Sequence, residues 1–124
     1  MGLKKIIPAS GEGSTSDALS WVTLATLTVD ADCSILIKDI WVNGTLTSNG
    51  DTATALAVHR ANRVSGTLAV IGSIVYLVTH NTGSDSSLRN TASRISISGN
   101  DILLQVRGIT GAMTWYGGFT AVLN

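Results

Sequence analysis

Turn-forming residues interrupt this sequence at short intervals, and this punctuation constrains the fold more than any other feature. Clusters rich in Gly, Asn, Asp and Ser fall at residues 30–33, 43–51, 62–66, 80–87, 98–101 and 108–111. The segments between them are rich in β-branched residues and run for about six to twelve residues, which suits strands rather than amphipathic helices. The pattern predicts an all-β fold: a single-domain antiparallel β-sandwich, jelly-roll-like, of about seven or eight strands.

Alternating apolar residues assign an inward face to most of these segments. Two segments lose the alternation part-way, which predicts one β-bulge near Ala25 and Thr26 and another near Lys38 and Asp39. Segment 67–78, TLAVIGSIVYLV, is apolar on both faces, which favours a central strand kinked at Gly72, or two strands divided there, over a helix. The last segment has the heaviest apolar face, formed by Met113, Trp115, Phe119, Ala121 and Leu123.

The glycine-rich stretch VRGITGAMTWYGG, residues 106–118, admits two interpretations. A glycine-spaced loop binds phosphate when it opens a helix, but this one precedes a strand pattern, with Arg107 as the nearby cation. A hairpin is therefore favoured, in which Gly108 and Gly111 supply positive φ between two paired strands. Gly117 and Gly118 lie inside the last strand, where they predict a bulge or the close approach of another chain.

The N-terminal segment differs in composition from the rest of the chain. Residues 8–20, PASGEGSTSDALS, are small and polar and bury too little apolar area to order themselves alone. We therefore expect a flexible N-terminal arm over residues 1–20 and a β-sandwich domain over residues 21–124. Such an arm would reach onto a neighbouring subunit or an underlying shell, and its predicted assembly contacts are Leu3, Lys4, Lys5, Ile6, Ile7 and Trp21.

The low charge of the chain limits the partners that it can attract. Eight basic and eight acidic side chains give a formal net charge of zero, and charged residues make up 13% of the sequence. Without a summed field, the chain is not expected to bind nucleic acid. A surface so poor in charge favours self-association, which predicts a homo-oligomer. The longest apolar run is about half a membrane span, and the N-terminus lacks the apolar run of a signal peptide, so neither membrane insertion nor export by that route is expected.

Carboxylates are sparse, and their positions argue against catalysis. Glu12 falls in the predicted arm. Five aspartates fall in turns, where their side chains cap backbone amides: Asp30, Asp32, Asp51, Asp85 and Asp101. A calcium ion held by Asp30, Asp32 and Asp51 is the alternative, but calcium takes about six to eight oxygen ligands, and no loop here concentrates that many carboxylates.

The remaining reactive side chains are equally scattered. His59 and His80 lie too far apart in sequence to suggest a metal pair, and no nucleophile elbow is recognisable. Cys33, the single cysteine, has no His near it in sequence and is interpreted as a buried, inert thiol. We therefore expect no enzymatic activity, no cofactor and no metal.

Aromatic residues suggest a competing class, a carbohydrate-binding module on a tail, fibre or cell surface. Trp21 begins the first strand beside the arm, and Tyr116 lies on the face opposite core-facing Trp115. Trp41, beside a predicted bulge, is assigned to the core or to a subunit contact. The segment 80–93 is too long for a simple hairpin, and loops of this length either bind a ligand or cover a neighbouring chain. The predicted glycan contacts are Trp21, Tyr116, His80, Asn81 and Arg89.

The order of four segments resembles a known family. The chain runs from IKDIWVNG through DTATALAVHRANRV and a long polar loop to RISISGNDILLQVRGITG and MTWYGGFTAVL. Over residues 37–123 this succession is similar to the small β-sandwich virion proteins of tailed bacteriophages. The resemblance implies a non-catalytic component of the virion, commonly trimeric, that binds other virion proteins such as the major capsid protein. A capsid-decorating (cement) protein is the favoured form, and a tail or fibre component is the alternative.

Overall fold

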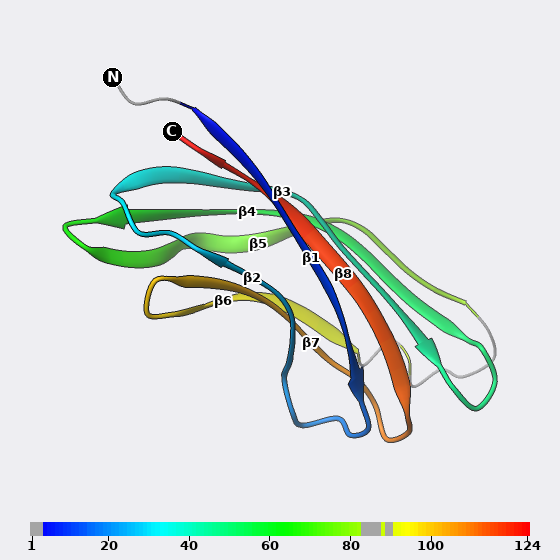
Figure 1. Cartoon of the computed structure of the whole chain (residues 1–124). Coiled ribbons are helices and arrows are strands. Elements are labelled where there is room, and N and C mark those ends of the chain that lie inside the picture. The colour runs from blue at the N-terminus through cyan, green and yellow to red at the C-terminus, as the bar shows by residue number, and fades with distance from the viewer. Residues whose placement is uncertain (1–3, 83–87, 89–90) are drawn as a thin grey trace.

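The computed structural model describes residues 4–82, 88 and 91–124, and this part of the chain forms β-strands and no α-helix (Figure 1). The strands are β1 (Lys5–Thr15), β2 (Val22–Thr28), β3 (Cys33–Leu46), β4 (Thr52–Val64), β5 (Thr67–Thr82), β6 (Ala92–Ser98), β7 (Asp101–Arg107) and β8 (Met113–Leu123). The predicted all-β class is confirmed.

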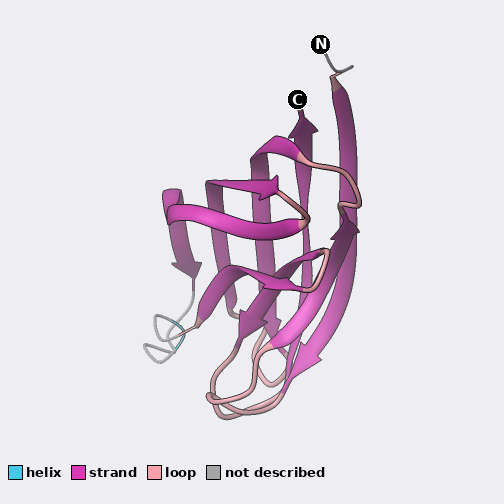
Figure 2. Ribbon diagram, turned by 90° about the vertical axis from the view of Figure 1, so that its left-hand side faces the viewer, coloured by secondary structure: helices cyan, strands magenta, loops and turns pink. Residues whose placement is uncertain are grey.

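The strands form two antiparallel sheets that pack as two layers (Figure 2). Sheet A has the strand order β1-β8-β3-β4-β5, and sheet B has the order β2-β7-β6. The core between them is built from the inward faces that alternation predicts, including those of β7 and β8. Its largest fully buried side chains include Trp115, Ile37, Ile40, Ile102 and Leu104. The predicted single-domain β-sandwich is therefore confirmed.

The flexible arm predicted over residues 1–20 is wrong for the part that forms β1. This strand pairs with β8 along its whole length, and the two lie side by side in Figure 1. Its glycines let it approach β2, because a Cβ on Gly11 would collide with the backbone carbonyl of Leu24. After β1, the Asp17 carboxylate accepts hydrogen bonds from the amides of Leu19 and Ser20. Backbone pairing and close packing thus order a segment that has few apolar side chains.

The predicted hairpin between residues 101–107 and 113–123 is also wrong. Strand β7 pairs with β2 and β6 in sheet B, whereas β8 pairs with β1 and β3 in sheet A, so the connection crosses between the sheets. Gly111 has the predicted positive φ, at 124°. Gly108 is instead buried in the crossing, where a Cβ would overlap the hydroxyl of Thr15. A short glycine-containing loop is compatible with a hairpin within one sheet and with a crossing between two sheets. Only the packing of the strands decides between these two connections.

Both predicted bulges are present. In β3 the register shifts between Ile37 and Ile40, and Asp39 there has a φ of 52°. In β2 the shift lies between Thr23 and Ala25, just before the predicted place. Each bulge lets the apolar residues on both sides of it face the core.

Residues 67–82 form one kinked strand rather than two. Gly72 has a φ of 70°, and the register with β4 shifts beside it. However, β5 lies at the edge of sheet A, so the prediction of a central strand is wrong. Burial within this chain does not account for its apolar residues, since Val75, Leu77 and Val78 stay exposed.

Candidate binding surfaces

Sheet A has an inner face toward the core and an outer face toward solvent, and pairing defines which residues share the outer one. Residues that pair across neighbouring strands lie side by side on one face of a sheet. Trp41 pairs with Gly118 and with Leu56, and Leu56 pairs with Val78, which makes a row from β8 to β5. A second row contains Ile6, Val122, Leu36, Arg60 and Ile71, from β1 to β5. The row between the two contains Pro8, Thr120 and Lys38, with Val58 paired to Val75.

We call this surface the apolar outer face; its exposed apolar members are Ile6, Leu36, Trp41, Leu56, Ile71, Val75, Val78 and Tyr116. Trp41 is 38% exposed, and its indole nitrogen lies over Gly118. The core alternative for Trp41 is therefore wrong, and its role in a subunit contact stays a prediction. Exposed apolar residues that cluster on one face often mark an interaction site.

Strand β5 adds an edge to this surface. It ends sheet A, and its 16 residues include no Asp, Glu, Lys, Arg or Pro. Leu77 lies at an irregularity in the β4–β5 pairing and is 63% exposed. On the inward side, Val70 and Tyr76 also remain partly exposed. An edge strand with unpaired backbone groups and no charge is a template for pairing with another chain.

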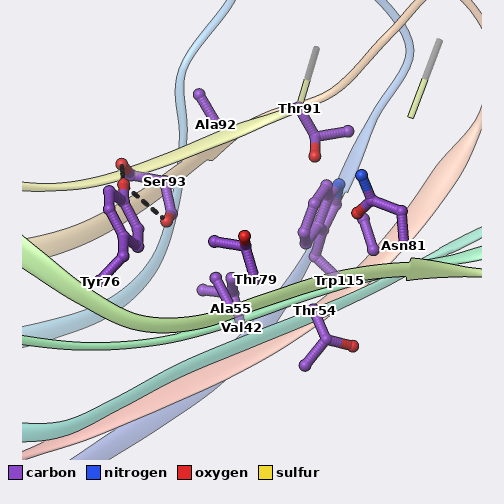
Figure 3. A pocket seen from close by; sticks show the side chains of 11 residues that line it. Val42, Thr54, Ala55, Tyr76, Thr79, Asn81, Thr91, Ala92, Ser93 and Trp115 are labelled. Atoms are coloured by element: carbon purple, nitrogen blue, oxygen red, sulfur yellow. Dashed lines mark hydrogen bonds between the residues drawn. The ribbon is translucent and has the colours of Figure 1, made fainter. Parts of the chain in front are cut away.

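A groove of about 420 Å³ opens between β5 and the start of β6 (Figure 3). At one end the Tyr76 hydroxyl donates a hydrogen bond to the carbonyl oxygen of Ser93, at 2.5 Å. Trp115 and Asn81 lie at the other end of the view, with Thr79 between. None of the described residues that line the groove is charged. Trp115 is almost fully buried, so its ring offers no open platform for a sugar.

Sheet B carries cationic and polar side chains on its outer face. Its inward positions are Ile95, Leu104 and Val106, so Arg94 and Arg107 point the other way. Both guanidinium carbons lie close to the Trp21 ring, 4.1 Å from the ring centroid for Arg94 and 4.8 Å for Arg107. Trp21 therefore contacts two arginines instead of standing alone as a stacking platform.

The predicted glycan contacts do not converge on one place. Tyr116 and His80 lie on the outer face of sheet A, in one row but separated by β3 and β4. Asn81 lines the groove, and Trp21 belongs to sheet B. Arg89 lies outside the described residues.

The predicted assembly contacts near the N-terminus begin just before β1. Lys4, Lys5 and Ile6 are exposed, and Ile7 is half-buried. Leu3 lies outside the described residues. Their contact with a partner stays a prediction, but the segment reaches β8 of its own chain.

Asp32 has hydrogen-bond partners within its own chain, and Cys33 is a free, partly buried thiol. Asp32 accepts hydrogen bonds from the amides of Gly66 and Ser65 and from Arg63, and these bonds hold the pKa of its carboxyl below the ordinary value. Cys33 is half-buried, whereas the sequence predicts a fully buried thiol. Its partial burial raises the pKa of the thiol. Across residues 4–82, 88 and 91–124, His, Cys, Asp and Glu form no group of three or more that could hold a metal.

His59 is the one buried histidine among the described residues. Its Nε2 lies 3.2 Å from the Gly72 carbonyl oxygen, and its Nδ1 has no partner within the described part of the chain. It faces inward on β4, whereas His80 faces outward on β5, so the fold does not bring the two together. The same described part contains no helix long and apolar enough to cross a membrane.

Comparison with known proteins gives one weak likeness. Neither a protein-family model nor a curated protein matches the chain. The fold is similar to part of a solved structure, the tailspike protein of Acinetobacter baumannii phage AM24, with a TM-score of 0.49 and 13% sequence identity. The match covers 95% of this chain and 26% of the tailspike chain, so this chain spans about a quarter of that protein's length. A likeness of this size establishes neither relationship nor function.

Sequence reasoning missed two of these surfaces. The apolar outer face was not predicted, although the 16 residues of β5 without a formal charge are a signal for it. The contact of Arg94 and Arg107 with Trp21 was also missed, because these residues are brought together from three separate segments. The position of Tyr116 as an exposed aromatic agrees with prediction, at 49% exposure.

Proposed function

We propose that this chain is a non-enzymatic structural subunit of a phage virion that assembles with copies of itself through β5 and the apolar outer face. The uncharged, exposed edge strand β5, continuous with an apolar sheet face, is the observation that carries the proposal. The resemblance of residues 37–123 to small β-sandwich virion proteins supports the virion as the particle to which this subunit belongs. It favours a capsid-decorating protein bound to the major capsid protein, with a tail or fibre position as the alternative.

A second copy of the chain is the partner that suits this surface. Removing apolar area from water stabilises a contact by about 25 cal/mol per Å², and backbone groups at a free edge gain hydrogen bonds when another strand pairs with them. Because β5 has no formal charge, a second β5 brings no like-charge repulsion. Repetition by symmetry then turns weak contacts into stable attachment. A trimer is the form that the resemblance implies.

Sedimentation of matched variants tests the self-association. Leu56→Lys places a charge at the centre of the apolar outer face, on a side chain that is 41% exposed and outside the core. We expect the wild-type chain to sediment as an oligomer and Leu56→Lys to sediment as a folded monomer. Thr26→Lys, on the exposed outer side of sheet B, is the control and should sediment like the wild type. A monomeric wild-type chain at high concentration would contradict the proposal.

Labelling of purified particles tests the virion role. An antibody against the folded chain should label intact particles in electron micrographs. Label over the head supports capsid decoration, and label confined to the tail supports the alternative position. Absence of the chain from purified particles, measured by mass spectrometry, would exclude both forms.

A further inference from the structure

Two arginines and a tryptophan meet on the outer side of sheet B, on the opposite layer from the apolar outer face. Trp21 precedes β2, Arg94 lies on β6, and Arg107 ends β7. The two guanidinium carbons lie 4.1 Å and 4.8 Å from the centroid of the same indole ring. All three side chains are partly exposed, so the cluster faces solvent.

The two cations have no carboxylate partner in the described part of the chain. The ion pairs found there join Arg63 to Asp32 and Lys38 to Asp39, and neither involves this cluster. Two like charges near one ring repel each other, although each is attracted by the indole face. An anion within reach of both guanidinium groups would be attracted by each of them.

The Arg94 side chain is fixed in place by its neighbours. Its Nε donates a hydrogen bond of 2.8 Å to the Gln105 side-chain oxygen, and the Gln105 amide donates one of 3.0 Å to the Thr23 hydroxyl. Because Nε donates to Gln105, the two terminal nitrogens of Arg94 are the donors that remain for a ligand. A guanidinium group held in this way loses little conformational entropy when it binds a planar carboxylate.

We propose that Trp21, Arg94 and Arg107 form a binding site for a carboxylate-bearing sugar. The carboxylate accepts hydrogen bonds from the guanidinium groups, which match its planar geometry. The outward side of sheet B around the cluster presents the polar side chains of Thr23, Ser96 and Gln105, with Leu103 as their apolar neighbour. Thr23 and Gln105 are hydrogen-bonded to each other and each retains a further donor for a ligand. Such groups suit sugar hydroxyls, whereas a protein partner is usually anchored by aromatic and apolar side chains in pockets. This site is separate from the proposed assembly surface and does not depend on it.

Nuclear magnetic resonance of the ¹⁵N-labelled full chain tests this site. The indole N–H signal of Trp21, assigned with a Trp21→Phe variant, reports on binding of a short polygalacturonate. We expect a saturable shift of this signal with polygalacturonate, suppressed by salt, and no shift with neutral dextran of similar length. Arg94→Gln and Arg107→Gln should each weaken binding about tenfold or more, the loss expected for a charge-assisted hydrogen bond.

Controls separate binding from folding and from assembly. Arg60→Gln removes an arginine from the outer face of sheet A and should leave the affinity unchanged, while amide spectra confirm that each variant is folded. Leu56→Lys should bind as the wild type does, even if self-association fails. Absence of a shift with polygalacturonate, or equal affinity after both arginines are replaced, would overturn the site. Equal or tighter binding of polyglutamate would overturn the assignment to a sugar and indicate an acidic peptide instead.

Discussion

The two edge strands of sheet A, β1 and β5, differ in how their free edges are protected. β1 carries Lys5, Pro8 and Glu12, the residue types that prevent edge-to-edge pairing. β5 has none of these types over its 16 residues and leaves Val75 and Leu77 exposed. Both strands have one hydrogen-bonded neighbour within the chain, β8 for β1 and β4 for β5.

This difference is the reason that the proposed assembly uses β5 rather than β1. β1 is also packed closely against β2 through its glycines, so it already has contacts on its inward face. The inward side of β5 stays partly open at the groove. The N-terminal segment that looks like an assembly arm therefore packs against both β8 and β2 of its own chain. β5 pairs with β4 and contacts β6, yet it keeps exposed apolar side chains.

The largest expected effect comes from disturbing the packing of β1. Gly11→Val would place side-chain atoms against the Leu24 carbonyl, which forces β1 away from β2. We expect it to lower the free energy of unfolding by about 3 kcal/mol, the scale of a severe overpacking change. Ser10→Val, at an exposed outward position of the same strand, should change it by no more than about 0.5 kcal/mol. Urea denaturation measures both, and equal effects would show that β1 is not held by this close approach.

The second prediction compares the two edges directly in self-association. Leu77 on β5 and Ile6 on β1 are almost equally exposed, at 63% and 61%. We expect Leu77→Lys to weaken the oligomer about tenfold or more, because it buries a charge in the contact, while Ile6→Lys, on the strand of sheet A farthest from β5, weakens it less. Sedimentation equilibrium measures both constants. If Ile6→Lys is the variant that dissociates, assembly runs through the N-terminal segment, as the sequence alone predicts.

The smallest effect concerns the turn that begins β5. Asp32 accepts hydrogen bonds from the amides of Gly66 and Ser65, which lowers the pKa of its carboxyl in the folded chain. Its stabilising contribution is therefore complete above the ordinary aspartate pKa and is lost as the pH falls through the lower, folded value. We expect the unfolding midpoint of the wild type to fall more steeply on acidification than that of Asp32→Asn. Parallel curves would show that this carboxylate does not hold the turn.

Local patterns in the sequence predict those parts of the fold that depend on neighbours along the chain. The alternation of apolar and polar residues predicts the inward residues of β7 and β8, and the interruption of this alternation predicts the bulge at Asp39. Such patterns fail where contact with a distant strand decides the outcome. In the sequence, Gly11 indicates a flexible segment, whereas in the structure it packs against the Leu24 carbonyl. The short loop around Gly111 is equally compatible with a hairpin and with a crossing between the sheets.

The candidate surfaces show the same difference between features set by local pattern and features set by contact with distant strands. An exposed Tyr116 is predictable, because its parity is opposite to that of buried Trp115. The apolar residues of β5 were assigned to a central strand, because hydrophobicity on both faces usually reflects burial on both faces. Burial in a partner chain produces the same pattern, and this alternative becomes visible only when β5 is placed at the edge of the sheet.

The sequence by itself determined that this chain forms short strands, which side of most strands faces inward, and that its surface carries little charge, because these properties depend on residue type and on spacing along the chain. Only the tertiary structure decided the order of strands within each sheet. That order leaves β5 at an edge and brings Arg94 and Arg107 to Trp21, and the packing of the two sheets places β1 against β2. The physical reason is that strand pairing and sheet packing join residues far apart in sequence, and many pairings satisfy the same local pattern.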